Sequence, residues 1–130
     1  MPNFPSLTWF ETTRERANAD TAFRALGSAD ARFGVRVDGQ TFAITLDAFE
    51  VARVGIATEE EAADLDFCLE MPAADWHTYL DGFASPKRRY LNDIDLTTAG
   101  GVLKGNARNR LLFARYNATI ERFFQLGAAP

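Results

Sequence analysis

The stretch ARFGVRVDGQTFAITLDA, residues 31–48, decides the fold class of this chain. Apolar and polar residues alternate on both sides of Asp38-Gly39, and such alternation is typical of half-buried β-strands. Asp-Gly between two such runs favours a type I′ hairpin, because both central residues of that turn need a positive φ. The stretch therefore predicts an antiparallel ribbon with one apolar face. The residues expected on that face are Phe33, Val35, Val37, Phe42, Ile44 and Leu46.

Further alternating runs extend this ribbon into a sheet. Residues 49–57 predict a third strand, residues 64–71 a fourth, and a short strand is expected at 102–103 between three glycines. The inward residues expected in the third strand are Ala52, Val54 and Ile56. Those expected in the fourth are Leu65, Phe67, Leu69 and Met71.

Helical patterns flank these strands. Residues 1–7 are expected to form an extended lead-in, and Thr8 opens the capping box Thr8-Trp9-Phe10-Glu11 of a first helix, which runs to about Leu26. Gly27 is expected to end this helix in the left-handed conformation.

Three more helices follow the fourth strand. Pro72 precedes a helix whose apolar stripe contains Trp76 and Leu80, and Ser85-Pro86 precedes a short one. Asn106 caps the longest helix, which is expected to run to about Leu126 and to stop at Gly127. Strands in sequence, with helices gathered at the ends, predict a single α+β domain over 1–130 with a mainly antiparallel sheet.

Composition excludes several function classes. The net charge of −4 argues against nucleic-acid binding, which needs a basic surface. The only cysteine, Cys68, cannot form an internal disulfide, which fits a reducing compartment. The first ten residues lack the pattern of a secretory signal, and no apolar run has the length of a membrane span. We therefore expect a soluble cytoplasmic protein.

Candidates for catalysis are few. The only imidazole, His77, is expected to lie off the buried stripe of its helix, and Cys68 stands between Asp66 and Glu70, whose charges disfavour a thiolate. One His and one Cys cannot build a zinc site of the usual kind. No catalytic residue, metal site or cofactor is predicted. Eleven phenylalanines instead indicate either a large core or an apolar pocket.

From Ala31 to Phe124 the chain resembles the SCP2-like (sterol carrier protein-2) family. The matching segments are FGVRVDGQTFAITLD at 33–47, ADLDFCLEM at 63–71 running into PAADWHTYLDG, and GVLKGNARNRLLFARY at 101–116. The chain departs from the family between Gly82 and Gly101, where SPKRRYLNDIDLTTAG is inserted, and it lacks the peroxisomal Ser-Lys-Leu ending.

This resemblance implies a five-stranded sheet with helices packed on one face, enclosing an apolar tunnel. It implies non-catalytic binding or transfer of a lipid or another hydrophobic small molecule, such as a fatty acyl or sterol-like compound. The residues expected to line the tunnel are Phe33, Val35, Phe42, Ile44, Leu46, Leu65, Phe67, Leu69, Trp76, Leu80, Leu112, Tyr116, Ile120, Phe123 and Phe124. Arg110 and Arg115 are the candidates for contact with an anionic headgroup.

Two alternatives stay open at this stage. One is a small ketosteroid-isomerase-like enzyme, which also encloses an apolar pocket but needs a buried Asp or His base and places its strands last. The other is an interaction or scaffold protein, either with a closed core or with its apolar face covered by a second subunit in a homodimer. The size and lining of the interior distinguish the three.

Overall fold

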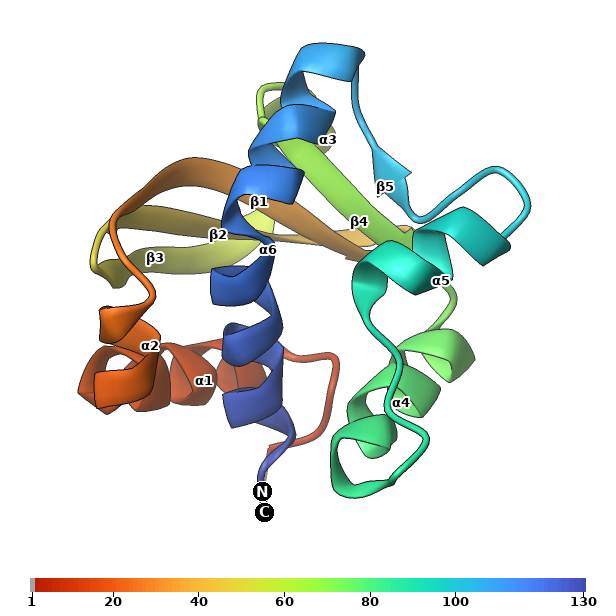
Figure 1. Ribbon diagram of the computed structural model, residues 1–130. Coiled ribbons are helices and arrows are strands. Elements are labelled where there is room, and N and C mark those ends of the chain that lie inside the picture. The colour runs from red at the N-terminus through yellow and green to blue at the C-terminus, as the bar shows by residue number, and fades with distance from the viewer. Residues whose placement is uncertain (1) are drawn as a thin grey trace.

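The computed structural model describes residues 2–130 as a five-stranded sheet with helices α1, α4 and α6 against one face (Figure 1). The strands are β1 (Ala29–Val37), β2 (Gln40–Ala48), β3 (Glu50–Ala57), β4 (Phe67–Met71) and β5 (Leu103–Lys104). The helices are α1 (Leu7–Ala19), α2 (Thr21–Ala25), α3 (Glu59–Ala63), α4 (Ala73–Asp81), α5 (Leu91–Thr97) and α6 (Ala107–Ala128), with a 3₁₀ turn, η1, at Gly82–Ala84. No helix of residues 2–130 combines the length and apolarity needed to cross a membrane.

The predicted hairpin is confirmed. Asp38 has φ 49° and Gly39 has φ 90°, the positive pair that a type I′ turn needs, and Val37 pairs with Gln40 directly beside the turn. The predicted inward residues of both strands are buried. Local sequence alone therefore specified the register of β1 and β2.

The sheet is mixed. The prediction of a mainly antiparallel sheet did not anticipate its one parallel pair. The strand order is β3-β2-β1-β4-β5, and β4 runs parallel to β1 while the other pairs are antiparallel. A parallel pair needs a crossover connection, and here α3 lies in the connection from β3 to β4. Alternation within a strand carries no information about the direction of its neighbour.

A bulge shifts the inward face of β3. The register with β2 changes between Thr45 and Leu46, so that Leu46 pairs with Val51, which is fully buried. The extra residue of a bulge reverses the alternation beyond it. The prediction for Ala52 was therefore wrong, whereas Val54 packs against the core as predicted. The prediction that Ile56 is buried was also wrong, because Ile56 is 53% exposed on the edge strand β3.

The first helix differs from the prediction at both ends. Its N-cap is Ser6, whose hydroxyl accepts the N–H of Trp9 at 3.1 Å, and not Thr8. It ends at Ala19, because the Asp20 carboxylate accepts the N–H of Phe23 at 2.7 Å and so begins the separate helix α2. The N-cap therefore lies two residues before the predicted one. The buried residues of α1 are Trp9, Phe10, Thr13 and Ala17.

Two later boundaries also differ. No helix follows Ser85-Pro86, and α5 begins only at Leu91, after the extended residue Tyr90. Gly127 does not stop α6 but lies inside it, one residue before its end. A Cβ at Gly127 would lie 2.4 Å from Cζ2 of Trp9, so this glycine allows the close approach of α6 to α1. Packing, and not helix termination, explains the residue.

Aromatic rings from the helices fill the inward face of the sheet. Examples are Phe10 of α1 on Phe42 of β2 and Phe113 of α6 on Phe67 of β4, with ring centroids 4.6 and 5.8 Å apart. The chain's own helices therefore cover the face that the hairpin presents.

Candidate functional site

A groove runs along the side of α6 that faces away from the sheet, with a volume of about 550 Å³. Figure 1 shows α2 on one side of this helix and the connection before α5 on the other. We call it the α6 groove. The residues that line it are Leu26, Arg88, Tyr90, Ala114, Arg115, Asn117, Ala118, Glu121, Arg122 and Gln125. Its volume lies in the range of small-molecule sites.

The centre of the α6 groove is apolar because of residue size and spacing. Ala114 and Ala118 stand one turn apart on the same face of α6, so their methyl groups form a shallow floor. Leu26 and Tyr90 flank the groove, and their side chains are 46% and 47% exposed. The arrangement offers apolar surface that no part of residues 2–130 covers.

Glu121 lies at the base of the groove and is only 4% exposed. One carboxylate oxygen accepts the hydroxyl of Tyr79, and the other accepts the N–H of Leu91 at 2.7 Å. Burial raises the pKa of Glu121 more than these hydrogen bonds and the nearby charge of Arg88 lower it. Burial, followed by the charge of Glu121, raises the pKa of Tyr79, which stays protonated.

Arg88 connects this buried carboxylate to the groove. Its guanidinium carbon lies 4.5 Å from the ring centre of Phe83 and 4.3 Å from that of Tyr90. Its Nη2 lies 3.7 Å from Oε1 of Glu121, and its buried Nε has no hydrogen-bond partner in residues 2–130. Cation–π contacts of this kind hold a guanidinium with little hydrogen bonding. Arg88 therefore fixes the position of Tyr90 at the groove wall.

The other two arginines of the groove differ in their partners. Nε and Nη2 of Arg122 bind the two oxygens of Asp20 at 2.9 and 3.0 Å, which holds α2 against α6. The hydrogen bond from Arg122 lowers the pKa of Asp20 more than burial raises it. Arg115 makes no ion pair within residues 2–130, and its guanidinium lies 5.5 Å from the Tyr116 ring centre. It is the cation of the groove with capacity for an anionic ligand.

The second headgroup candidate, Arg110, is engaged elsewhere. It donates to Oδ2 of Asp95 at 3.0 Å and to the carbonyl of Leu103 at 2.8 Å. Burial alone would raise the pKa of Asp95, but the N–H groups of Leu103 and Val102 and the charge of Arg110 together lower it. Arg110 thus joins α6, α5 and β5, and Arg115 alone of the two borders the groove.

The predicted tunnel residues lie in the core, except for one. Leu112 and Tyr116 are half-buried, and the other predicted tunnel residues apart from Leu65 are buried. Leu65 is the exception, because residues 64–66 form a turn and its side chain crosses to the outer face beside Gly34. The α6 groove and three other hollows of residues 2–130 border none of the predicted set except Leu65. Their role in lining a tunnel stays a prediction.

The titratable side chains considered for catalysis lie apart from this groove. His77 is exposed and packs edge-on against the Phe4 ring, 5.9 Å between centroids. Burial raises the pKa of the Cys68 thiol more than the charge of Arg36 lowers it. Residues 2–130 contain no cluster of three His, Cys, Asp or Glu side chains that could hold a metal ion.

Sequence reasoning missed the buried Glu121 and its partners. An acidic residue between Ile120 and Phe123, in the apolar part of a helix, was the available signal. A buried carboxylate needs hydrogen-bond donors, and these come from α4 and from the start of α5. Only the tertiary structure identifies them.

Comparison with solved structures places this geometry in a known fold. The crystal structure of sterol carrier protein 2 superposes with a TM-score of 0.74 over 97% of this chain and 98% of that one, at 17% identity. The chain has the sterol carrier protein 2 fold. A second match is a conserved hypothetical protein of Thermus thermophilus, described as a candidate sterol carrier protein, with a TM-score of 0.59, 19% identity, and coverage of 98% and 92%. No protein-family model and no curated protein sequence matches the chain. Because one fold hosts many functions, the fold alone does not identify a ligand, and the chemistry of the groove has to indicate it.

Proposed function

We propose that the protein binds or transfers a hydrophobic small molecule with an anionic end, such as a fatty acyl or sterol-like compound, without changing it chemically. The observation that carries this proposal is the α6 groove, where exposed Leu26 and Tyr90 flank an alanine floor and Arg115 has no carboxylate partner among the described residues. The likeness to sterol carrier protein 2 supports the same function.

The energetics of such a ligand are sufficient. Burial of a methylene group contributes roughly 0.8 kcal/mol, so about 12 methylenes contribute on the order of 10 kcal/mol before the cost of association. A charge-assisted hydrogen bond from the Arg115 guanidinium to a carboxylate or phosphate adds specificity for the anionic end. After an association cost of about 4 kcal/mol or more, a fully buried tail leaves up to roughly 6 kcal/mol, which corresponds to an affinity of about tens of micromolar.

The tail of the ligand also has a route toward the predicted tunnel residues. The backbone of α6 is non-helical at Tyr116, with φ −106° and ψ 15°, and this break separates the first half of the helix from the second. Leu112 and Tyr116, next to the break, are predicted lining residues of α6 that are only half-buried. We propose that the first half of α6 moves outward at Tyr116 when a long tail enters between it and Phe67.

Glu121 favours a second candidate, acid–base catalysis. A carboxyl group with a raised pKa beside a groove is a common feature of active sites. However, Tyr79, Leu91 and Arg88 already engage its oxygens, and the chain superposes on sterol carrier protein 2 over 97% of its length. Binding without catalysis is therefore the function that the geometry supports best.

Displacement of a fluorescent fatty-acid analogue tests the proposal, together with native mass spectrometry for co-purified lipid. We expect saturable binding in the micromolar range. Ala118→Phe fills the groove floor and is expected to weaken binding about tenfold or more, since it removes most of the buried apolar area. Arg115→Gln is expected to weaken binding of fatty acids about threefold or more.

Matched variants separate these effects from general damage. Ala74→Phe introduces the same side chain at an exposed position of α4, and Arg108→Gln removes the same charge at an exposed position of α6. Neither position lines the groove. The proposal is wrong if no probe binds saturably at about tens of micromolar and no lipid co-purifies, or if Ala74→Phe weakens binding as much as Ala118→Phe.

A further inference from the structure

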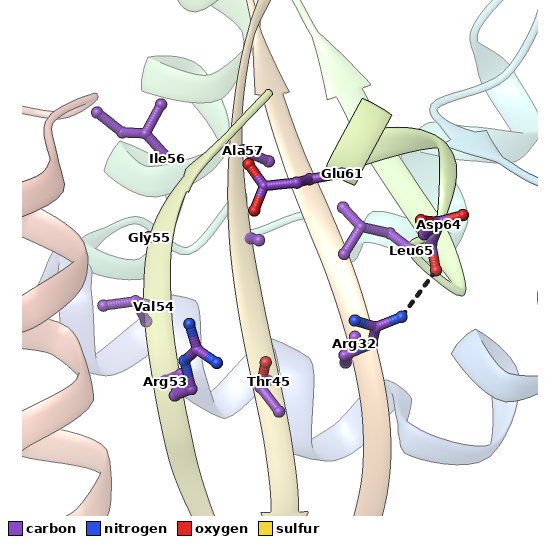
Figure 2. Close-up of a pocket in the computed structure, with 11 residues that line it drawn as sticks. Arg32, Thr45, Arg53, Val54, Gly55, Ile56, Ala57, Glu61, Asp64 and Leu65 are labelled. Carbon is purple, nitrogen blue, oxygen red and sulfur yellow. Dashed lines mark hydrogen bonds between the residues drawn. The ribbon is translucent and has the colours of Figure 1, made fainter. Parts of the chain in front are cut away.

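The outer face of the sheet, turned away from α1, α4 and α6, carries a second hollow of about 290 Å³ (Figure 2). We call it the outer hollow, and Arg32, Ala43, Thr45, Arg53, Gly55 and Leu65 bound it. It lies on the opposite side of the sheet from the α6 groove. Any ligand of the outer hollow is therefore independent of the function proposed above.

Strand register places two arginines on either side of one hydroxyl. Arg32 of β1 is paired with Thr45 of β2, and Thr45 is paired with Arg53 of β3. Neighbouring strands are about 4.8 Å apart, so the backbones of the two arginines are separated by roughly 10 Å across Thr45. Figure 2 shows the three side chains in this row, with Thr45 in the middle. Long side chains can reach a common ligand over that span.

The next row of the sheet has almost no side chains, which creates the hollow. Gly34 is paired with Ala43, and Ala43 is paired with Gly55. Leu65 packs over this row, since a Cβ at Gly34 would lie 2.9 Å from Cδ1 of Leu65. A small-residue floor thus lies directly beside the two guanidinium groups, with an apolar side chain as one wall.

Neither arginine of this row makes an ion pair within residues 2–130, although the charge of Arg53 helps to lower the pKa of Glu61. The Arg53 side chain makes no hydrogen bond or ion pair within residues 2–130, and that of Arg32 donates only to the carbonyl of Asp64, at 3.0 Å. Arg36, four residues along β1 on the same face, is different, because its guanidinium pairs with Glu70 at 3.0 Å and Glu59 at 3.6 Å. The sheet therefore neutralises one arginine of its outer face and leaves the pair at the hollow available.

Two acids, Glu61 and Asp64, also line the hollow, and Asp64 contacts Arg32 through its backbone carbonyl. Glu61 lies at the end of the hollow away from Thr45, and its carboxylate accepts the N–H of Thr58 at 3.0 Å. The hydrogen bonds from Thr58 lower the pKa of Glu61, which keeps the carboxylate charged. A ligand with its anionic group at the arginine end and its uncharged part toward Leu65 avoids repulsion by this acid.

We propose that the outer hollow binds a small organic anion. Its carboxylate or phosphate group lies over Thr45, between the guanidinium groups of Arg32 and Arg53, and its apolar part lies on Ala43 and Gly55 against Leu65. Guanidinium forks match the geometry of carboxylate and phosphate oxygens, and the hydroxyl supplies a third donor.

Two-dimensional NMR of the intact chain, titrated with phenyl phosphate, benzoate and inorganic phosphate at constant ionic strength, tests this inference. We expect saturable shifts of the amides at 43–45 and 53–55 with at least one of the two aromatic anions, at millimolar concentration. Phenyl phosphate is expected to bind about threefold or more tightly than inorganic phosphate, because only the former contacts Leu65.

Variants locate the site. Arg53→Gln is expected to weaken binding about fivefold or more, and Arg53→Lys is expected to weaken it less, because lysine keeps the charge but not the fork. Arg108→Gln, with the same charge change on α6, should leave the affinity unchanged, as should Ala118→Phe in the α6 groove. Shifts that stay linear up to about 50 mM for both aromatic anions, or equal affinities for wild type and Arg53→Gln, overturn the proposal.

Discussion

Replacement of Gly127 by alanine tests the packing of α6 on α1. Gly127 is buried and helical, so helix propensity alone predicts that Gly127→Ala stabilises the protein by about 1 kcal/mol. The structure predicts the opposite sign. The added Cβ would lie 2.4 and 2.5 Å from Cζ2 and Cη2 of Trp9, and 2.7 Å from Oγ1 of Thr13. Real Cβ atoms do not approach other atoms so closely, and one of the helices has to move.

The surroundings prevent a cheap rearrangement. Trp9 is 4% exposed, and its ring lies 4.9 Å from those of Phe4 and Phe10. Thr13 is held by a hydrogen bond to the carbonyl of Trp9 at 2.7 Å. Overpacking of a close-packed core costs about 1–3 kcal/mol. After a gain in propensity of about 1 kcal/mol, the expected net loss is about 1 kcal/mol for the middle of this range and about 2 kcal/mol for its upper end.

Urea unfolding followed by circular dichroism measures this difference. Gly82→Ala is the matched control, because Gly82 has helical dihedral angles and a Cβ there would lie 3.7 Å from the nearest atom, an ordinary contact. The control is expected to be neutral or more stable by up to about 1 kcal/mol. Combining Gly127→Ala with Trp9→Leu should recover part of the loss as a favourable coupling energy. If Gly127→Ala alone is as stable as wild type, the close approach of the two helices is refuted.

Two further outcomes follow from the core and from Glu121. Phe42→Ala should lower the free energy of unfolding in urea by about 3–5 kcal/mol, the value for a close-packed phenylalanine. The reason is that Phe42 is 2% exposed and stacks on Phe10. A clearly smaller loss would indicate that Phe42 borders an open tunnel. Glu121→Gln should change the pH dependence of stability. The folded-state pKa of Glu121 is raised above its ordinary value, so its contribution is fully present below the unfolded pKa and is lost as pH rises through the folded pKa. Wild type should therefore lose stability relative to Glu121→Gln as pH rises above 4.5, the ordinary pKa of the group, and an unchanged difference on raising the pH would contradict the assignment.

The fold-level expectations that held have a common physical basis. The hairpin at Asp38-Gly39 and the cap of α6 at Asn106 depend on residues adjacent in sequence, and both are confirmed. Hydrophobic periodicity also identified the buried faces of β1, β2, β4 and the second half of α6. The resemblance to sterol carrier protein-2 is matched by the fold of the solved structure.

The expectations that failed depended on contacts distant in sequence. Thr8 and Ser6 are both good caps, and the choice between them is made by the packing of Trp9 and Phe10 under α6 and against β2. Gly127 is a residue type that commonly ends helices, but here it allows α6 to pack closely on Trp9 of α1. Leu65 fits the alternation of β4, yet it lies in a turn and packs over Gly34.

By itself the sequence determined most of the strands and helices and most of the buried positions, because these follow from backbone propensity and from periods of 2 and 3.6 residues. Only the tertiary structure decided where surfaces remain open. The α6 groove needs Leu26, Tyr90 and Ala118 brought together from three segments, and the outer hollow needs the register of three strands. A side chain's capacity for a ligand depends on which partners it already has, and for Arg53, Arg110 and Arg115 those partners come from elsewhere in the chain or are absent from the described residues 2–130.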